Sequence, residues 1–226
     1  MARAQKRVGR KEIRQDPLMK VVVKGRGWMD VHGNKAMIGV IALVVAIIAV
    51  IVVRNMRFSA NDEAQVSLAQ ARQMLMENRE TDALALFEET STRFKGTQGG
   101  ANALFSLAEL KLADGENEEA LEIFKRFEKK YGSEFMLNFG AMSGQAVALE
   151  NLQRFDEAAV VFEKIASKDK YGHLQPYALY EAGRCWIRAG DETKAQGYFD
   201  RVVKEYPDSP EKRDAERELA LLNIKL

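Results

Sequence analysis

Hydrophobic and polar positions follow two different patterns along the chain. From Ala36 to Val53 there are 18 consecutive residues without a charge, and Lys35 and Arg54 close the run. As a helix this run would span roughly 27 Å, near the thickness of a bilayer's hydrocarbon core. Beyond it, apolar residues recur at helical spacing to the end of the chain. The pattern predicts an all-α protein with four parts: a basic segment at 1–35, a transmembrane helix at 36–54, a linker at 55–62 and a helical domain at 63–226.

Two other interpretations of the apolar run are weaker. A buried helix of a soluble protein rarely runs this long without a polar residue. A cleaved signal peptide usually has a shorter apolar core closer to the N-terminus. Here 35 residues precede the run, and Arg54-Asn55-Met56-Arg57 follows it in place of small residues suited to cleavage. We therefore expect an uncleaved signal-anchor.

Charge is distributed unequally on the two sides of this segment. Residues 1–35 carry ten Lys and Arg against three acids, a net of +7, whereas residues 36–226 carry 24 against 30, a net of −6. Positive charge beside a membrane helix stays in the cytoplasm. We expect a cytoplasmic N-terminus and a helical domain outside the cytoplasm. The basic segment either sets this topology or docks on a membrane partner.

The helical domain contains a repeated pattern in which an Ala is followed four positions later by Phe. The four Ala–Phe pairs are Ala83 and Phe87, Ala120 and Phe124, Ala158 and Phe162, and Ala195 and Phe199. The spacings between the Ala residues are 37, 38 and 37, and a small residue lies twelve positions before each of them: Ala71, Ala108, Ala146 and Gly183. A polar turn precedes each pair. The pattern predicts two antiparallel helices per unit, which must stack on neighbouring units to bury their apolar faces.

These residues resemble the tetratricopeptide repeat family. Unit four, Pro176–Pro210, matches most fully, through Leu179, Ala182, Gly183, Trp186, Ala195, Phe199, Val202 and Pro207. The resemblance implies an α-solenoid of about four helical hairpins with a capping helix at Arg213–Lys225. Because the period exceeds the family's usual length, longer loops are expected at Gly96–Gly100, Gly132–Asn138 and Lys168–Gln175.

In that family the first helix of each unit lines a concave, protein-binding face. Carried onto this register, the resemblance places further residues there: Asn102, Ser143, Val147, Glu150 and Asn151. The residues expected to bind protein are Phe105, Glu109, Tyr177, Tyr180, Arg184 and Arg188. Tyr and Arg are types that anchor protein interfaces. An alternative is that Phe105 and Tyr180 only pack on neighbouring units.

The order of the parts resembles the YfgM-like ancillary subunits of the Sec translocon. The exported array is also similar to the periplasmic repeat protein of the Tol-Pal system and to the repeat lipoprotein of outer-membrane assembly, although no Cys follows the span to take a lipid. The resemblance implies a scaffold or adaptor of the bacterial inner membrane, facing the periplasm, that assists translocated or periplasmic proteins. The alternative is a structural accessory subunit of an inner-membrane assembly, held by its span and basic segment.

Candidate chemistry points away from an enzyme. The two histidines, His32 and His173, would lie on opposite sides of the membrane, and no motif for metal binding, nucleophilic catalysis or phosphate binding is present. Cys185 is expected to be a buried packing thiol. We expect no catalytic, metal or cofactor site, and other proteins and the bilayer as partners, with no nucleic acid or small-molecule substrate. The charge runs Glu116–Glu119 and Lys125–Lys130 are expected to be solvated helix faces with pairs such as Glu122–Arg126.

Overall fold

The computed structural model describes the backbone of residues 17–225 and the side chains of 32–35, 37–168, 170–223. Of the basic segment expected at 1–35, residues 1–16 lie outside the described residues. The chain divides into two compact units that meet between Arg57 and Phe58, and each is considered by itself. Residues 17–225 form helices and turns without a strand, which confirms the all-α fold class.

The first unit is dominated by helix α2 (Pro17–Met76), which continues into the second unit. Residues 37–53 are exposed, and α2 contains the one stretch among the described residues that is long and apolar enough to cross a membrane. Residues 55–62, expected as a polar connector, are helical. They contain neither Gly nor Pro, and polar composition alone does not end a helix.

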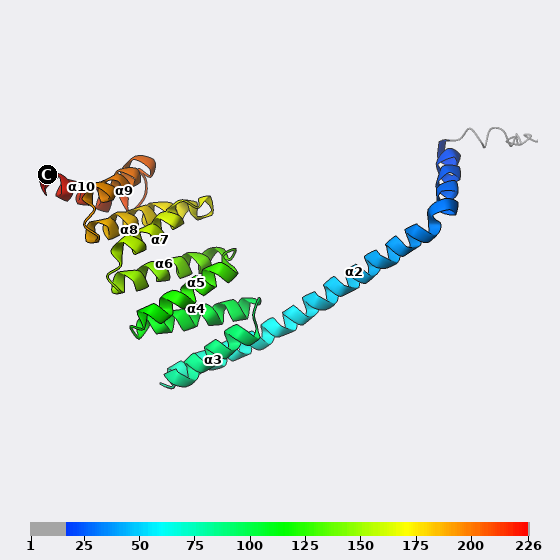
Figure 1. Ribbon diagram of the computed structural model, residues 1–226, viewed down its shortest axis with the longest axis horizontal. Helices are drawn as coiled ribbons and strands as arrows, with labels where there is room; N and C mark the ends of the chain where they lie inside the picture. Colours follow the sequence, from blue (N-terminus) through cyan, green and yellow to red (C-terminus); the bar gives the residue numbers. More distant parts are fainter. Residues whose placement is uncertain (1–16, 226) are drawn as a thin grey trace, which may run out of the picture. The chain divides into compact units, whose positions relative to one another are not determined.

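The second unit is a row of helical hairpins followed by a single helix (Figure 1). The end of α2 pairs with α3 (Glu80–Arg93) through the buried side chains of Leu68, Ala71 and Phe87. The later hairpins are α4 (Gln98–Ala113) with α5 (Asn117–Tyr131), α6 (Phe135–Asn151) with α7 (Phe155–Ala166), and α8 (Gln175–Arg188) with α9 (Glu192–Glu205). Helix α10 (Lys212–Lys225) packs on α9 and confirms the expected capping helix. This is the predicted α-solenoid.

The repeated small and aromatic residues form its core. The four Ala residues that open the second helices, and the small residues twelve positions earlier, are all buried. The exposed fractions of Phe124, Phe162 and Phe199 are 1%, 1% and 0%. A Cβ built on Gly183 would lie 2.6 Å from Phe199 Cε1, so this small residue admits the ring directly against the helix backbone. The predicted repeat register is confirmed.

The turn inside each hairpin has the same backbone geometry in all four units. Asn78, Gly115, Gln153 and Gly190 occupy equivalent positions, with φ of 58°, 78°, 60° and 84°. The next residue donates its N–H to a carbonyl five residues back, as in Arg79 N to Met74 O at 2.8 Å and Asp191 N to Trp186 O at 2.9 Å. This pairing satisfies carbonyls at the end of the first helix with a left-handed residue at its C-terminal cap.

Substitutions at this turn should therefore change stability through the backbone alone. A Cβ built on Gly115 or Gly190 has no heavy atom within 4 Å, so no clash would occur. Replacing Gly190 with Ala should still lower the free energy of unfolding by about 1 kcal/mol, because an L-residue disfavours positive φ. Replacing Gln153 with Gly should raise it or leave it unchanged. Urea unfolding would test both, and a stabilising Gly190→Ala would contradict this account.

The loops between units differ from the expectation. Helix α4 begins at Gln98 and α6 at Phe135, so the first two connections are shorter than predicted. The third, expected at Lys168–Gln175, contains the 3-10 helix η1 (Asp169–Leu174). Gly99 lies inside α4. A Cβ at this position would come within 2.4 Å of Ala64 Cβ, which explains why the residue is a glycine. Its N–H donates to Asn61 Oδ1 at 2.9 Å. Close packing, not a turn, explains this glycine.

Candidate functional site

The first helices of units two to four, α4, α6 and α8, form a continuous face, here called the first-helix face. Phe105 of α4 lies against α6, because a Cβ on Gly140 would meet Phe105 Cζ at 2.9 Å. Arg188 of α8 bonds Glu150 of α6, with Nη1 and Oε2 2.7 Å apart. These contacts place the residues predicted from the register on neighbouring helices.

Four of the predicted residues follow one side of α8: Tyr177, Tyr180, Arg184 and Arg188. Their spacing of three, four and four residues keeps them on one helix face. Both tyrosines are half-buried and both arginines are exposed. The Tyr177 ring lies edge-on to that of Phe162, with centroids 6.3 Å apart, and the Tyr180 ring is 5.7 Å from that of Phe199. The tyrosine rings are thus held in place by packing on phenylalanines, whereas the arginine side chains are exposed to solvent.

Two carboxylates orient these arginines. Glu181 accepts from Arg184 Nη1 at 2.6 Å, and Glu150 accepts from Arg188 Nη1 at 2.7 Å. The glutamate side chains are only 13% and 16% exposed, whereas the arginines are 44% and 45% exposed. Burial raises the pKa of Glu181, and the nearby Arg184 guanidinium opposes this shift. Burial also raises the pKa of Tyr177, with the Glu181 charge adding to it, so its hydroxyl stays a neutral donor and acceptor.

The other two predicted residues, Phe105 and Glu109, lie on α4, and α6 separates them from α8. The Phe105 ring is half-buried and edge-on to Phe124 and Phe127, at centroid distances of 5.9 and 5.7 Å. Glu109 is exposed. Partial burial raises its pKa, and the nearby Arg72 guanidinium opposes this shift without reversing it. The structure therefore brings together the α8 residues and leaves the α4 pair as a separate part of the face.

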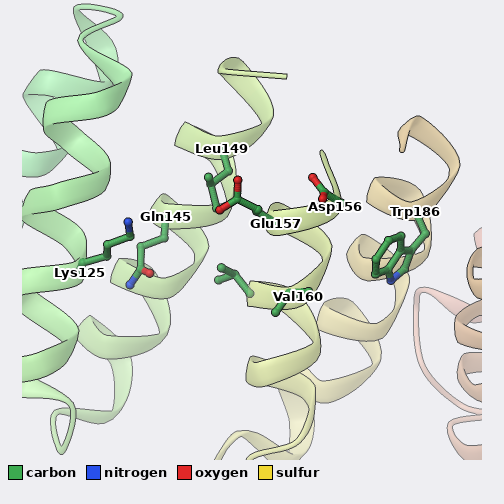
Figure 2. Close-up of a pocket in the computed structure, with 8 residues that line it drawn as sticks. Lys125, Gln145, Leu149, Asp156, Glu157, Val160 and Trp186 are labelled. Carbon is green, nitrogen blue, oxygen red and sulfur yellow. The ribbon is translucent and has the colours of Figure 1, made fainter. Parts of the chain in front are cut away.

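A cavity of about 280 Å³ is lined by side chains from α5, α6, α7 and α8 and was not predicted from the sequence (Figure 2). Its apolar wall includes Leu149, Val160 and Trp186. Val160 is 53% exposed, while the Trp186 indole is nearly buried and donates from Nε1 to Glu163 at 2.6 Å. The Lys194 ammonium lies 3.6 Å from the Trp186 ring centroid. Because its lining comes from four different helices, no pattern within one segment of the sequence indicates this cavity.

The nucleophilic side chain singled out in the sequence, Cys185, is not activated in the structure. Cys185 is buried, and burial raises the pKa of its thiol to about 12, with the Glu150 charge adding to the shift. At neutral pH it is a protonated packing thiol and a poor nucleophile. Among the described residues no group of three or more His, Cys, Asp and Glu is placed to hold a metal ion.

Comparison with known proteins identifies the family. Residues 68–135 and 106–173 match one tetratricopeptide repeat model, and residues 177–209 match another. The chain is a tetratricopeptide repeat protein. No curated protein matches its sequence.

Two solved structures are similar to its fold. MamA, residues 41 to the end, from Desulfovibrio magneticus RS-1 is 17% identical with a TM-score of 0.54, over 73% of this chain and 85% of that one. A Podosopora anserina protein of nearly identical TPR-like repeats is 16% identical with a TM-score of 0.53, over 72% and 86%. The tetratricopeptide repeat fold is a scaffold for protein–protein interaction, and this chain has that architecture.

Proposed function

We propose that this tetratricopeptide repeat protein is a membrane-anchored adaptor of the bacterial cell envelope that binds a segment of another protein on its first-helix face. The observation that carries this proposal is the row on α8, where two anchored tyrosines and two oriented arginines share one helix face. Tyr and Arg dominate the energetics of many protein interfaces, because each offers a large area with a polar end.

The membrane anchor rests on α2. Side chains 37–53 are exposed, although nearly all are apolar. In lipid such a face needs no other cover, and the helix satisfies its own backbone groups. The basic excess before the run favours a cytoplasmic N-terminus and repeats outside the cytoplasm. The proposed role is to assist translocated or periplasmic proteins, as the resemblance to YfgM-like subunits implies.

Protease treatment of spheroplasts tests this topology. With an epitope tag at each end of the chain, added protease should remove the C-terminal tag and the repeats and spare the N-terminal tag. A cytoplasmic protein serves as the control for intact cells. If only the N-terminal tag is removed, the orientation is reversed and the repeats cannot meet exported proteins.

The alternative, a structural subunit held by its span and basic segment, predicts a different dependence on residues 1–35. Replacing these residues with an unrelated basic segment of equal charge preserves the anchor. The adaptor should then keep its partner, captured by crosslinking in membranes, whereas an assembly subunit should lose it. Loss of the partner in this variant would favour the structural role.

A further inference from the structure

A second cavity, of about 600 Å³, lies between α3 and α5 at the ends of these second helices. Its floor includes Leu104 and Ser91, which are 2% and 3% exposed. Four cations line it: Lys95, Arg126, Lys129 and Lys130. No carboxylate lines the cavity. Apart from Leu104 of α4, its lining residues lie on α3, on α5 and in the loop after α3, and none of them is among the residues predicted to bind protein.

Within the described residues the four cations are not neutralised by acidic side chains, although the Lys130 ammonium lies 4.8 Å from the Tyr131 ring centroid. Among the described residues none of them makes an ion pair, whereas Arg184, Arg188 and many others do. The predicted Glu122–Arg126 pair is wrong. Glu122 bonds Lys125 instead, with Nζ and Oε1 3.0 Å apart, which leaves the Arg126 guanidinium available at the cavity.

Shape and charge together define the ligand. The lining residues come from two repeats, and the buried floor is already satisfied, since Ser91 Oγ donates to Glu88 O at 2.9 Å. The four cations are exposed around this floor. An anion entering the cavity would gain several charge-assisted hydrogen bonds without displacing an internal carboxylate. The volume exceeds that of a single phosphate ion and accommodates two or three side chains.

We propose that this basic cavity binds a short acidic segment of a partner protein, through carboxylate side chains. The net charge of the whole second unit, with these four cations included, favours a short ligand. Residues 58–226 contain 22 Lys and Arg against 30 Asp and Glu, a net of −8. A long polyanion or an anionic membrane would meet this repulsion over most of its length, whereas a short peptide would feel mainly the local cations. The proposal does not depend on the first-helix face.

The test uses the full chain in detergent micelles and two fluorescein-labelled peptides of ten residues. One peptide has Glu and Asp at alternate positions, and the other has Gln and Asn there. Fluorescence anisotropy should show the acidic peptide binding at least about tenfold more tightly, with an affinity that falls as salt rises. The variant Arg126→Gln/Lys129→Gln should weaken acidic-peptide binding about tenfold or more, since both cations contact the ligand directly.

The matched control is Lys204→Gln/Arg213→Gln, which removes the same charge from α9 and α10 and should change binding less than about twofold. Circular dichroism and urea unfolding establish that each variant is folded. Lys95→Gln, from a different element, gives a second and smaller loss if Arg126→Gln/Lys129→Gln fails to fold. The proposal is overturned by equal binding of both peptides or by equal loss in the control. Preferential binding of phosphatidylglycerol vesicles, an oligonucleotide or inorganic phosphate alone would also overturn it.

Discussion

Replacing Phe124 with Ala should lower the free energy of unfolding of the repeat domain by about 3–5 kcal/mol. The ring is 1% exposed and is edge-on to Phe105 of α4, with centroids 5.9 Å apart. On its other side it meets α6 so closely that a Cβ on Gly144 would lie 2.4 Å from Phe124 Cζ. Removing the ring would leave a cavity shared by two repeats that neither can close without moving a helix.

Phe58 supplies the matched control, because it is 69% exposed at the start of the same unit. Phe58→Ala should change the free energy of unfolding by less than about 0.5 kcal/mol. Urea unfolding of the full chain in a mild detergent, followed by circular dichroism, measures both. If Phe124→Ala behaves like Phe58→Ala, the repeat boundary drawn through this ring is wrong.

The repeat register was readable from the sequence because it depends on side-chain volume at fixed spacing. Ala83, Ala120 and their equivalents lie where the two helices of a unit come closest. A larger residue at these positions would hold the helices apart. The capping helix followed from the same period. The turns were also located, but their shared left-handed residue was not, because Gln153 gives no local signal for positive φ.

Helix boundaries at glycines and polar segments were harder to predict. Gly99 and Gly100 suggested a loop, yet both are buried in the first turn of α4, where Thr97 Oγ1 accepts from Gly100 N at 3.0 Å. A glycine chosen for close approach and one chosen for a turn are identical in sequence. Only the neighbouring helix, here Ala64 against Gly99, distinguishes them.

The candidate site was predictable in part for a related reason. The α8 row follows from helical spacing within one segment, and that spacing is readable in the sequence at Tyr177, Tyr180, Arg184 and Arg188. Ion pairs and cavities depend on distances between segments. The pairing of Arg188 with Glu150, 38 residues apart, and the walls of the basic cavity arise only when hairpins stack.

Changing Tyr180 to Phe together with Arg184 to Ala should weaken binding of the partner protein by roughly 2 kcal/mol, a loss of about 30-fold. Tyr180→Phe keeps the ring that packs 5.7 Å from Phe199 and removes only the hydroxyl. Arg184 is 44% exposed, so its loss removes a contact offered to a ligand and little internal packing. The urea midpoint should therefore change much less than the affinity. The measurement is a Kd for the partner captured by crosslinking in membranes.

Arg201→Ala is the control for a generic loss of charge. Arg201 is 48% exposed and pairs with Glu205 on its own helix, as Arg184 pairs with Glu181, but it belongs to the second-helix layer on α9. It should leave partner binding within about twofold of the unchanged protein. Equal losses for Arg184→Ala and Arg201→Ala would mean that net charge, not the first-helix face, governs capture. A double variant that unfolds at lower urea without a separate loss of affinity would place Tyr180 and Arg184 in the core and the binding face elsewhere.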